Sequence, residues 1–168
     1  SLISLAGKPQ GLVATFLDIS VEYNERILLE IERLCIEGLQ RSPDFQGVLF
    51  DFCKNFDSHF PGSICSILFV QPDGKTLGNL ISPNMPDGLR QYMAAFPIGP
   101  EECSCGTAVF RKEPVIVTDI MEDPLWQNYA PLVKPYGLIT CWSFPFFNAE
   151  QDVLGTFAIY YSYSRQPT

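Results

Sequence analysis

Two cysteines separated by one residue are the side chains in this sequence with the most evident chemistry. Cys103 and Cys105 have a spacing that could contribute to a metal site. Such a site needs about four ligands, and no second pair of cysteine or histidine residues follows at a usual spacing. His59 is the only histidine and lies far from the pair in sequence, which argues against haem ligation and Cys–His catalysis. The sequence therefore argues against a zinc or iron–sulfur centre.

The residues after this pair predict a helix start beside the end of a strand. Gly106 and Thr107 let the chain turn into a helix whose first backbone N–H groups lack intrahelical partners. Pro114 would end the helix because it cannot donate the next hydrogen bond. Residues 115–117 are β-branched and predict a buried strand, which ends on Asp119. This geometry suits a small polar ligand, but it also occurs in folds that bind nothing.

Composition and charge limit the possible functions. With 168 residues, of which 46% are hydrophobic, the chain is expected to be mainly one globular domain. No apolar run approaches the roughly 18–20 residues needed to cross a bilayer, and the first residues lack the layout of a signal peptide. The net charge of −8 repels phosphate backbones, so we expect no nucleic-acid partner. Because Ser1 is not a natural start, we expect an excerpt of a longer chain.

The six cysteines are expected to be reduced. Cys35 and Cys53 lie in helical patterns, and Cys65 and Cys141 lie in strand-like patterns, where a free cysteine behaves as a small apolar residue. A domain this apolar does not need disulfide bonds for stability. We therefore expect a cytoplasmic location, with no membrane contact from this segment.

Two helices are predicted in the first third of the chain. Residues 21–41 carry one apolar stripe that would pack on the core or pair between two copies of the chain. Residues 44–58 carry aromatic side chains at three- and four-residue intervals, which favour core packing over stacking on a cofactor. Residues 1–20 contain a strand that ends in an Asp-Ile-Ser triplet. This tail resembles the last strand of a PAS domain; the alternative is a simple N-terminal extension.

Strands and short helices alternate along the rest of the chain. An Asp-Gly turn between residues 63–70 and 76–82 predicts a β-hairpin. The further predicted elements are a helix from Asp87 through Met93, an extended piece over 96–100, a helix from Asp123 to Tyr136, and strands over 138–147 and 153–163. This order indicates an α+β fold with one antiparallel sheet and helices packed against its faces.

Several short motifs occur in a fixed order in the second half of the chain. They are Cys105-Gly106-Thr107-Ala108, residues 113–117 with Asp119-Ile120, Asp123-Pro124-Leu125-Trp126, Gly137-Leu138, Cys141-Trp142-Ser143 with Pro145, and residues 153–158. From about residue 24 to residue 163 the sequence resembles a GAF domain, a sensory module of bacterial signalling proteins. The similar subgroup occurs beside PAS domains in proteins with cyclic-di-GMP synthase, phosphodiesterase or histidine-kinase outputs. The resemblance implies a GAF domain over 21–168 whose central six-stranded antiparallel sheet has helices on both faces.

The resemblance also implies a ligand pocket on one face of the sheet, roofed by the segments around residues 98–136. Carried across, its lining would include Ile98, Cys105, Thr107, Asp119, Trp126, Tyr129, Trp142 and Ser143. The aromatic rings could stack on a flat ligand and the hydroxyls could hydrogen-bond to it. The alternative is that the rings belong to the core and that Asp119 caps a helix. The ligand and any cofactor stay unknown, and no metal is implied.

Two departures from the family argue against particular classes of ligand. The Asn-Lys-Phe-Asp-Glu motif of phosphodiesterase GAF domains is absent, which argues against cAMP and cGMP. The bilin-attaching Cys-His pair of phytochromes is also absent.

Three functions follow from the resemblance. The first is a non-catalytic sensor that binds a small molecule or relays a conformational signal to an output domain, as a homodimer through helix 21–41. The second is an enzyme, because Cys-Gly-Thr-Ala also resembles free methionine-(R)-sulfoxide reductases, with Cys105 as a redox thiol. That family has its nucleophilic cysteine in the pocket roof, and residues 121–136 contain none, so we expect no enzyme activity. The third is a structural dimerisation module between a PAS domain and an output domain.

Overall fold

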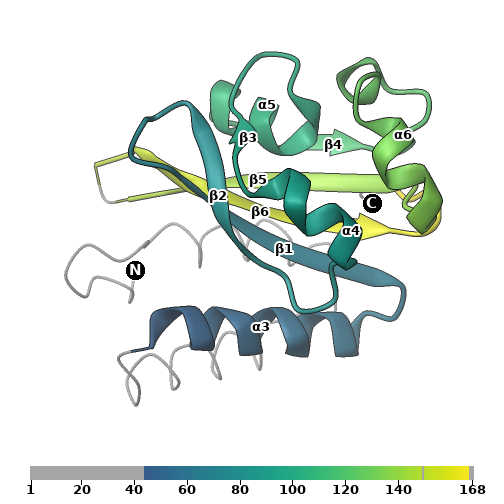
Figure 1. Cartoon of the computed structure of the whole chain (residues 1–168), viewed down its shortest axis with the longest axis horizontal. Coiled ribbons are helices and arrows are strands. Elements are labelled where there is room, and N and C mark those ends of the chain that lie inside the picture. The colour runs from purple at the N-terminus through teal and green to yellow at the C-terminus, as the bar shows by residue number, and fades with distance from the viewer. Residues whose placement is uncertain (1–43, 149, 167–168) are drawn as a thin grey trace.

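An antiparallel sheet forms the middle layer of the protein in a computed structural model that describes residues 44–148 and 150–166 (Figure 1). Its six strands lie in the order β3-β2-β1-β6-β5-β4, and every neighbouring pair is antiparallel. The strands are β1 (Ser63–Val70), β2 (Thr76–Ile81), β3 (Phe96–Pro97), β4 (Val115–Val117), β5 (Thr140–Phe147) and β6 (Val153–Tyr161). The expected α+β fold with a six-stranded antiparallel sheet is confirmed.

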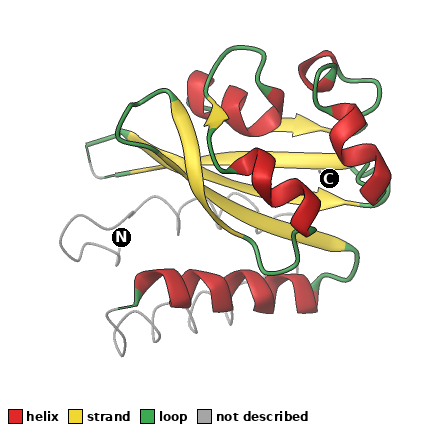
Figure 2. Ribbon diagram, in the orientation of Figure 1, coloured by secondary structure: helices red, strands yellow, loops and turns green. Residues whose placement is uncertain are grey.

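Helices cover both faces of this sheet, as Figure 2 shows. One face carries α3 (Phe45–His59), and the other carries α4 (Asp87–Arg90), α5 (Cys103–Arg111) and α6 (Ala130–Val133). Three short 3-10 helices complete the second layer: η1 (Gln91–Met93), η2 (Pro124–Trp126) and η3 (Lys134–Tyr136). The predictions for residues 1–20 and for helix 21–41 lie outside the described residues.

The aromatic stripe of α3 forms the core on the first face. Asp44 caps the helix by accepting a hydrogen bond from the Gly47 N–H at 2.9 Å. Phe52 and Phe56 pack edge-on against Phe157 of β6, with ring centroids 5.9 and 5.7 Å apart. This confirms the predicted helix over 44–58 and its packing role.

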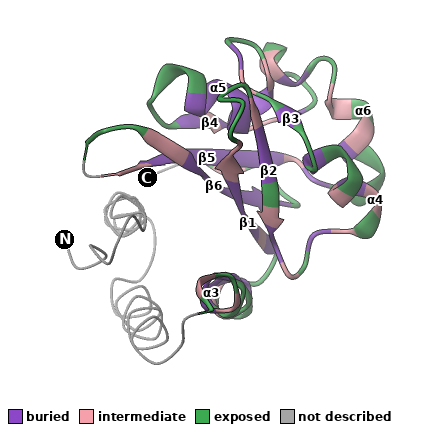
Figure 3. Cartoon of the chain, turned by 60° about the vertical axis from the view of Figure 1, so that its left-hand side comes forward, coloured by how far each residue is buried: buried purple, intermediate pink, exposed green. Residues whose placement is uncertain are grey.

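Strand β5 is buried on both faces, so it separates two cores (Figure 3). Trp142, Phe144 and Phe146 point into the core beneath α3. Cys141 and Ser143, on either side of Trp142, point toward α5, because side chains alternate along a strand. This alternation determines which of the candidate residues on β5 face the helices of the second layer.

Helix α5 begins earlier than the sequence predicted. Its first residue is Cys103, and the Gly106 N–H is already bonded to the Glu102 carbonyl oxygen at 3.1 Å. The predicted helix start at Gly106-Thr107, with unpaired N–H groups there, is therefore wrong. A Cβ atom at Gly106 would lie 2.3 Å from the Pro97 carbonyl oxygen. Glycine at this position therefore allows α5 to lie close to β3. The helix ends at Lys112, which takes a left-handed conformation, two residues before Pro114.

The segment from Asp123 to Tyr136 is not the single helix that the sequence predicted. It consists of η2, α6 and η3, and a proline lies in the first turn of each. Pro131 and Pro135 cannot donate the hydrogen bonds that would join the pieces, so the segment folds as a series of short turns.

Candidate functional site

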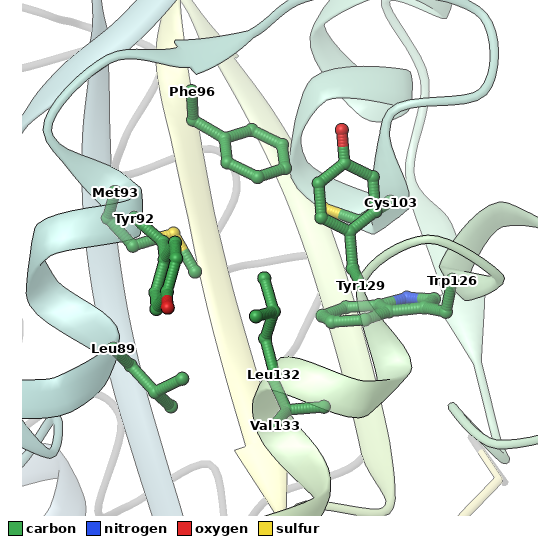
Figure 4. Close-up of a pocket in the computed structure, with 9 residues that line it drawn as sticks. All are labelled: Leu89, Tyr92, Met93, Phe96, Cys103, Trp126, Tyr129, Leu132 and Val133. Carbon is green, nitrogen blue, oxygen red and sulfur yellow. The ribbon is translucent and has the colours of Figure 1, made fainter.

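A pocket opens between the short helices on the second face of the sheet (Figure 4). Its space is about 280 Å³, which includes the mouth open to solvent. The lining side chains are apolar or aromatic: Leu89, Tyr92, Met93, Phe96, Cys103, Trp126, Tyr129, Leu132 and Val133. They come from four parts of the chain, namely α4–η1, β3, the start of α5, and η2–α6. The pocket therefore depends on how these pieces are held against one another.

Trp126 anchors the roof of the pocket. Asp123 caps η2 by accepting a hydrogen bond from the Leu125 N–H at 2.9 Å, and Pro124 follows at the first position, as predicted. The Trp126 ring is fully buried, and its Nε1–H donates to the Ser104 hydroxyl at 2.8 Å. Its ring also meets Tyr160 edge-on, with centroids 6.4 Å apart. The roof is thus tied both to α5 and to the sheet.

Tyr129 closes the side of the pocket toward α5. Its ring packs on Phe96 with centroids 5.1 Å apart, and its hydroxyl donates to the Glu102 carboxylate. Burial raises the pKa of Tyr129 above its ordinary value, and the Glu102 carboxylate adds to the rise. The phenol therefore stays protonated and remains a hydrogen-bond donor at neutral pH.

A cluster of thiols and hydroxyls lies behind the apolar lining. The Cys105 Sγ is 3.3 Å from the Ser143 Oγ and 3.7 Å from the Tyr160 hydroxyl, and the Cys141 Sγ is 3.6 Å from the same Ser143 Oγ. Cys103, Cys105 and Cys141 are all buried free thiols. Hydrogen bonds from the Cys103 and Cys141 thiols lower the pKa of Cys105 well below its ordinary value, against the opposing effect of burial.

The pKa values of the other two thiols shift in the opposite direction. Burial raises the pKa of Cys103 and of Cys141, and the negative charge on Cys105 adds to both. Within the cluster, Cys105 is therefore the thiol that gives up its proton most readily.

The structure brings together some of the residues predicted for the site. Trp126 and Tyr129 line the pocket, and Cys105 and Ser143 meet in the thiol cluster. Thr107 is buried within α5, where its hydroxyl accepts a hydrogen bond from the Glu102 N–H at 3.1 Å.

The other three predicted residues lie elsewhere. Ile98 packs partly buried against the core of the second face, and its N–H donates to the Lys75 carbonyl oxygen. Asp119 accepts a hydrogen bond from the Met121 N–H at 2.9 Å, which is a local turn role. Trp142 lies on the opposite face of the sheet, in the core beneath α3, with the Arg165 guanidinium 5.5 Å from its ring centroid. It cannot stack on a ligand in this pocket, because the sheet lies between them.

Several lining residues were not identified from the sequence. Leu89 and Met93 lie in the helix predicted after Asp87, and Leu132 and Val133 lie in the segment predicted after Asp123. Their helical spacing was a usable signal, but it indicated core packing only. The start of α5, where the sequence suggested a place for a small polar ligand, contributes the Cys103 side chain to an apolar lining.

The described residues, 44–148 and 150–166, contain no group of three His, Cys, Asp or Glu side chains placed to hold a metal ion. Within the same residues, no helix has both the length and the apolar character to cross a bilayer.

A six-stranded antiparallel sheet with helices on both faces, and a pocket under the short helices of one face, defines the architecture of this α+β domain. The family model for the GAF domain matches residues 24–168. The chain belongs to the GAF domain family.

Relatives and solved structures agree with this family. The chain is 25% identical over 158 residues to the methyl sulfide methyltransferase-associated sensor of Methanosarcina acetivorans, a match that covers 94% of this chain and 16% of that protein. A protein from Burkholderia vietnamiensis described as a GAF sensor has a similar fold, with a TM-score of 0.67 and 13% identity over 87% of this chain and 84% of that one. Free methionine-R-sulfoxide reductase from Neisseria meningitidis, solved with its substrate, has a TM-score of 0.66 and 14% identity over 98% and 84%. At these identities the two structures show the fold alone.

Proposed function

We propose that this GAF domain is a non-catalytic sensory module that binds a small, uncharged, largely apolar molecule and relays its presence to an output domain. The observation that carries the proposal is the pocket itself. Aromatic, aliphatic and sulfur-containing side chains from four separate segments converge on one opening. Small-molecule sites commonly have such linings.

The lining limits the chemistry of the ligand. None of the side chains that line the pocket is charged, so an ionic group on the ligand would lose its hydration without gaining a partner. The Tyr129 hydroxyl is already bonded to Glu102, so it offers the ligand little beyond its ring face. The space of about 280 Å³ includes the mouth open to solvent, so a bound molecule would be small and would lie partly in the mouth or displace lining side chains.

The contacts of the roof supply a path for the signal. A ligand that moves Trp126 also pulls on Ser104, because their side chains are hydrogen-bonded. Ser104 belongs to α5, which packs against β4, β5 and β6. A change in the roof would therefore reach the sheet through this helix.

The setting of the domain is also a proposal. The Methanosarcina relative is named as a sensor, and the chain spans only 16% of that protein, so further domains are expected around it. We propose a cytoplasmic homodimer paired through helix 21–41, with a PAS domain before it and a cyclic-di-GMP or histidine-kinase output after it. The sequence resemblance supports this arrangement.

Native mass spectrometry tests the proposal. The protein as purified is expected to carry an extra mass of a few hundred daltons that is lost on denaturation. Trp126→Phe removes the Nε1–H that holds the roof and should reduce the bound fraction, whereas Trp142→Phe, its match on the opposite face, should not. An equal loss in both variants, or no bound mass in the parent protein, would leave a domain that dimerises and transmits without sensing.

The second candidate is a free methionine-(R)-sulfoxide reductase. The fold of the Neisseria enzyme favours it, but residues 121–136, which roof the pocket here, contain no cysteine. We expect no turnover of free methionine-(R)-sulfoxide with a thiol reductant. Turnover that Cys105→Ser abolishes would establish the enzyme instead.

A further inference from the structure

Three of the nine side chains that line the pocket reach solvent, and they form its mouth. The other six are buried. Tyr92 is 46% exposed, and Tyr129 and Leu132 are partly buried. A molecule that enters from solvent therefore meets these three side chains first.

The two walls beside the mouth are joined at two points. One wall is α4–η1 with the start of β3, and the other is η2–α6–η3. At the first point the Tyr129 ring packs on Phe96, with centroids 5.1 Å apart, and its hydroxyl donates to the Glu102 carboxylate. At the second point the Tyr136 hydroxyl lies so close to Gly88 that a Cβ atom there would overlap it. The pocket therefore cannot widen by separation of its walls unless these contacts break.

The side chain of Leu132 lies between these walls. Figure 4 shows it pointing into the middle of the lining, with Tyr92 on one side and Trp126 and Tyr129 on the other. The side chain has no polar atom, so it can turn to another rotamer without breaking a hydrogen bond. The backbone N–H of Leu132, by contrast, is bonded to the Tyr129 carbonyl oxygen at 2.9 Å. Leu132 can therefore leave the middle of the pocket while both walls stay in place.

We propose that Leu132 determines the size and shape of the molecule that the pocket admits, and that this molecule is an uncharged planar aromatic that takes the place of the Leu132 side chain. The inference rests on the proposed sensory function and names the class of its ligand. A flat molecule in this place would have the Tyr92 ring on one side and the rings of Trp126 and Tyr129 on the other. Pairs of aromatic rings attract one another beyond their buried area, in offset-stacked or edge-to-face arrangements. A saturated ring system of the same skeleton is thicker and gains no such pairing.

The same displacement would reach the roof of the pocket. The Leu132 N–H donates to the Tyr129 carbonyl oxygen, and the Tyr129 N–H donates to the Trp126 carbonyl oxygen at 2.8 Å. These two bonds join α6 to the turn that carries Trp126. A ligand in the place of the Leu132 side chain would therefore press on the residues that position the roof.

Equilibrium dialysis with 2-naphthol tests the inference, because this probe is planar and is uncharged at neutral pH. In the parent protein the Leu132 side chain must leave before the probe binds, and an apparent affinity falls with the fraction of molecules in which a site is open. Leu132→Ala removes this cost, so 2-naphthol should bind at least about tenfold more tightly than it binds the parent. Leu132→Phe fills the space with a larger side chain and should weaken binding at least about tenfold.

Leu125→Ala is the matched control. Leu125 is also partly buried and packs against the same core, but it lies on η2 and does not line the pocket. Its substitution removes the same atoms and should leave the affinity for 2-naphthol unchanged. Circular dichroism checks that each variant is folded, and Leu132→Phe keeps the test decisive if Leu132→Ala does not fold.

The shape of the ligand is tested with decahydro-2-naphthol, the saturated and non-planar counterpart of the probe. It should bind the parent and Leu132→Ala at least about tenfold more weakly than 2-naphthol does. Equal affinities for the two probes, or no binding of 2-naphthol to either protein, would overturn the planar aromatic class. An affinity that does not change in Leu132→Ala and Leu132→Phe, or that changes equally in Leu125→Ala, would refute the role of Leu132. None of these results would remove an extra mass seen by native mass spectrometry, so failure of this inference is distinguishable from failure of the sensory function.

Discussion

The contact between α5 and β3 gives a prediction whose magnitude the structure supplies. At Gly106 a Cβ atom would lie 2.3 Å from the Pro97 carbonyl oxygen, whereas real Cβ contacts almost never fall below 3.0 Å. Gly106→Ala must therefore push α5 away from β3 by a large part of an ångström. Overpacking of this kind costs about 1–3 kcal/mol. Alanine recovers about 0.5–1 kcal/mol through its better helix propensity, so we expect a net loss of about 1 kcal/mol, and at most about 2.5 kcal/mol, in the free energy of unfolding.

Gly47→Ala is the matched control for this substitution. Gly47 is also helical, and its Cβ would also lie 2.3 Å from an oxygen, but that oxygen belongs to the flexible side chain of Asp44. The side chain can rotate away, which costs its cap on the helix, about 0.5–2 kcal/mol. Alanine gains about 0.5–1 kcal/mol through its helix propensity, which roughly offsets that loss, so the change in stability should stay near zero. The two variants differ mainly in whether the obstructing oxygen can move.

Urea unfolding followed by circular dichroism measures both variants. The melting temperature gives an independent estimate, since about 1 kcal/mol shifts it by roughly 2–4 °C in a domain of this size. If Gly106→Ala were as stable as Gly47→Ala, α5 would not rest on the Pro97 carbonyl, and the described wall of the pocket would be misplaced.

Two further predictions concern buried polar groups. Ser104→Ala removes the acceptor of the Trp126 Nε1–H and leaves that group buried without a partner, so urea unfolding should show a loss of about 1–3 kcal/mol; a loss below about 0.5 kcal/mol would contradict the bond. Burial raises the pKa of Asp57 against the hydrogen bonds from Asn84 and Cys65, so the folded state binds its proton more tightly than the unfolded state does. This group therefore destabilises the fold above its folded pKa, and the penalty disappears as the pH falls toward the unfolded value of about 3.9. The stability of Asp57→Asn relative to the parent should rise between pH 4 and 7, and a constant difference over that range would contradict the burial of the carboxylate.

Local patterns in the sequence were enough to predict the sheet and helix α3. The Asp73-Gly74 turn marked the β1–β2 hairpin, and the aromatic spacing marked α3. These signals worked because both are set by neighbours in the chain. The prediction of one helix after Asp123 was wrong because it used the apolar spacing alone. That spacing is helical, but Pro131 and Pro135 interrupt the backbone hydrogen bonds.

The candidate site was harder to predict because it depends on the faces of buried strands. Strand β5 is buried almost throughout, so no alternation of polar and apolar residues indicates which side chains face which layer. Trp142 and Ser143 were expected in the same pocket, yet a period of two places them on opposite faces. Leu89 and Leu132 reach the pocket from separate short helices, and only the tertiary structure brings them together.

The strength of the pairing limits which elements can carry a signal from the pocket. Strands β1, β6 and β5 are paired on both sides, and a register shift of one residue would turn every buried side chain to the wrong face. A graded change in the pocket therefore cannot travel as a sliding of these strands. By contrast, β3 lies at the edge and pairs through only two residues, and α5 rests directly on its Pro97 carbonyl. We therefore expect α5 and β3 to move as one unit relative to β1, β6 and β5, which keep their register, so the signal reaches the sheet through the contacts of α5. The Trp126–Ser104 bond is the point where the roof of the pocket acts on that unit.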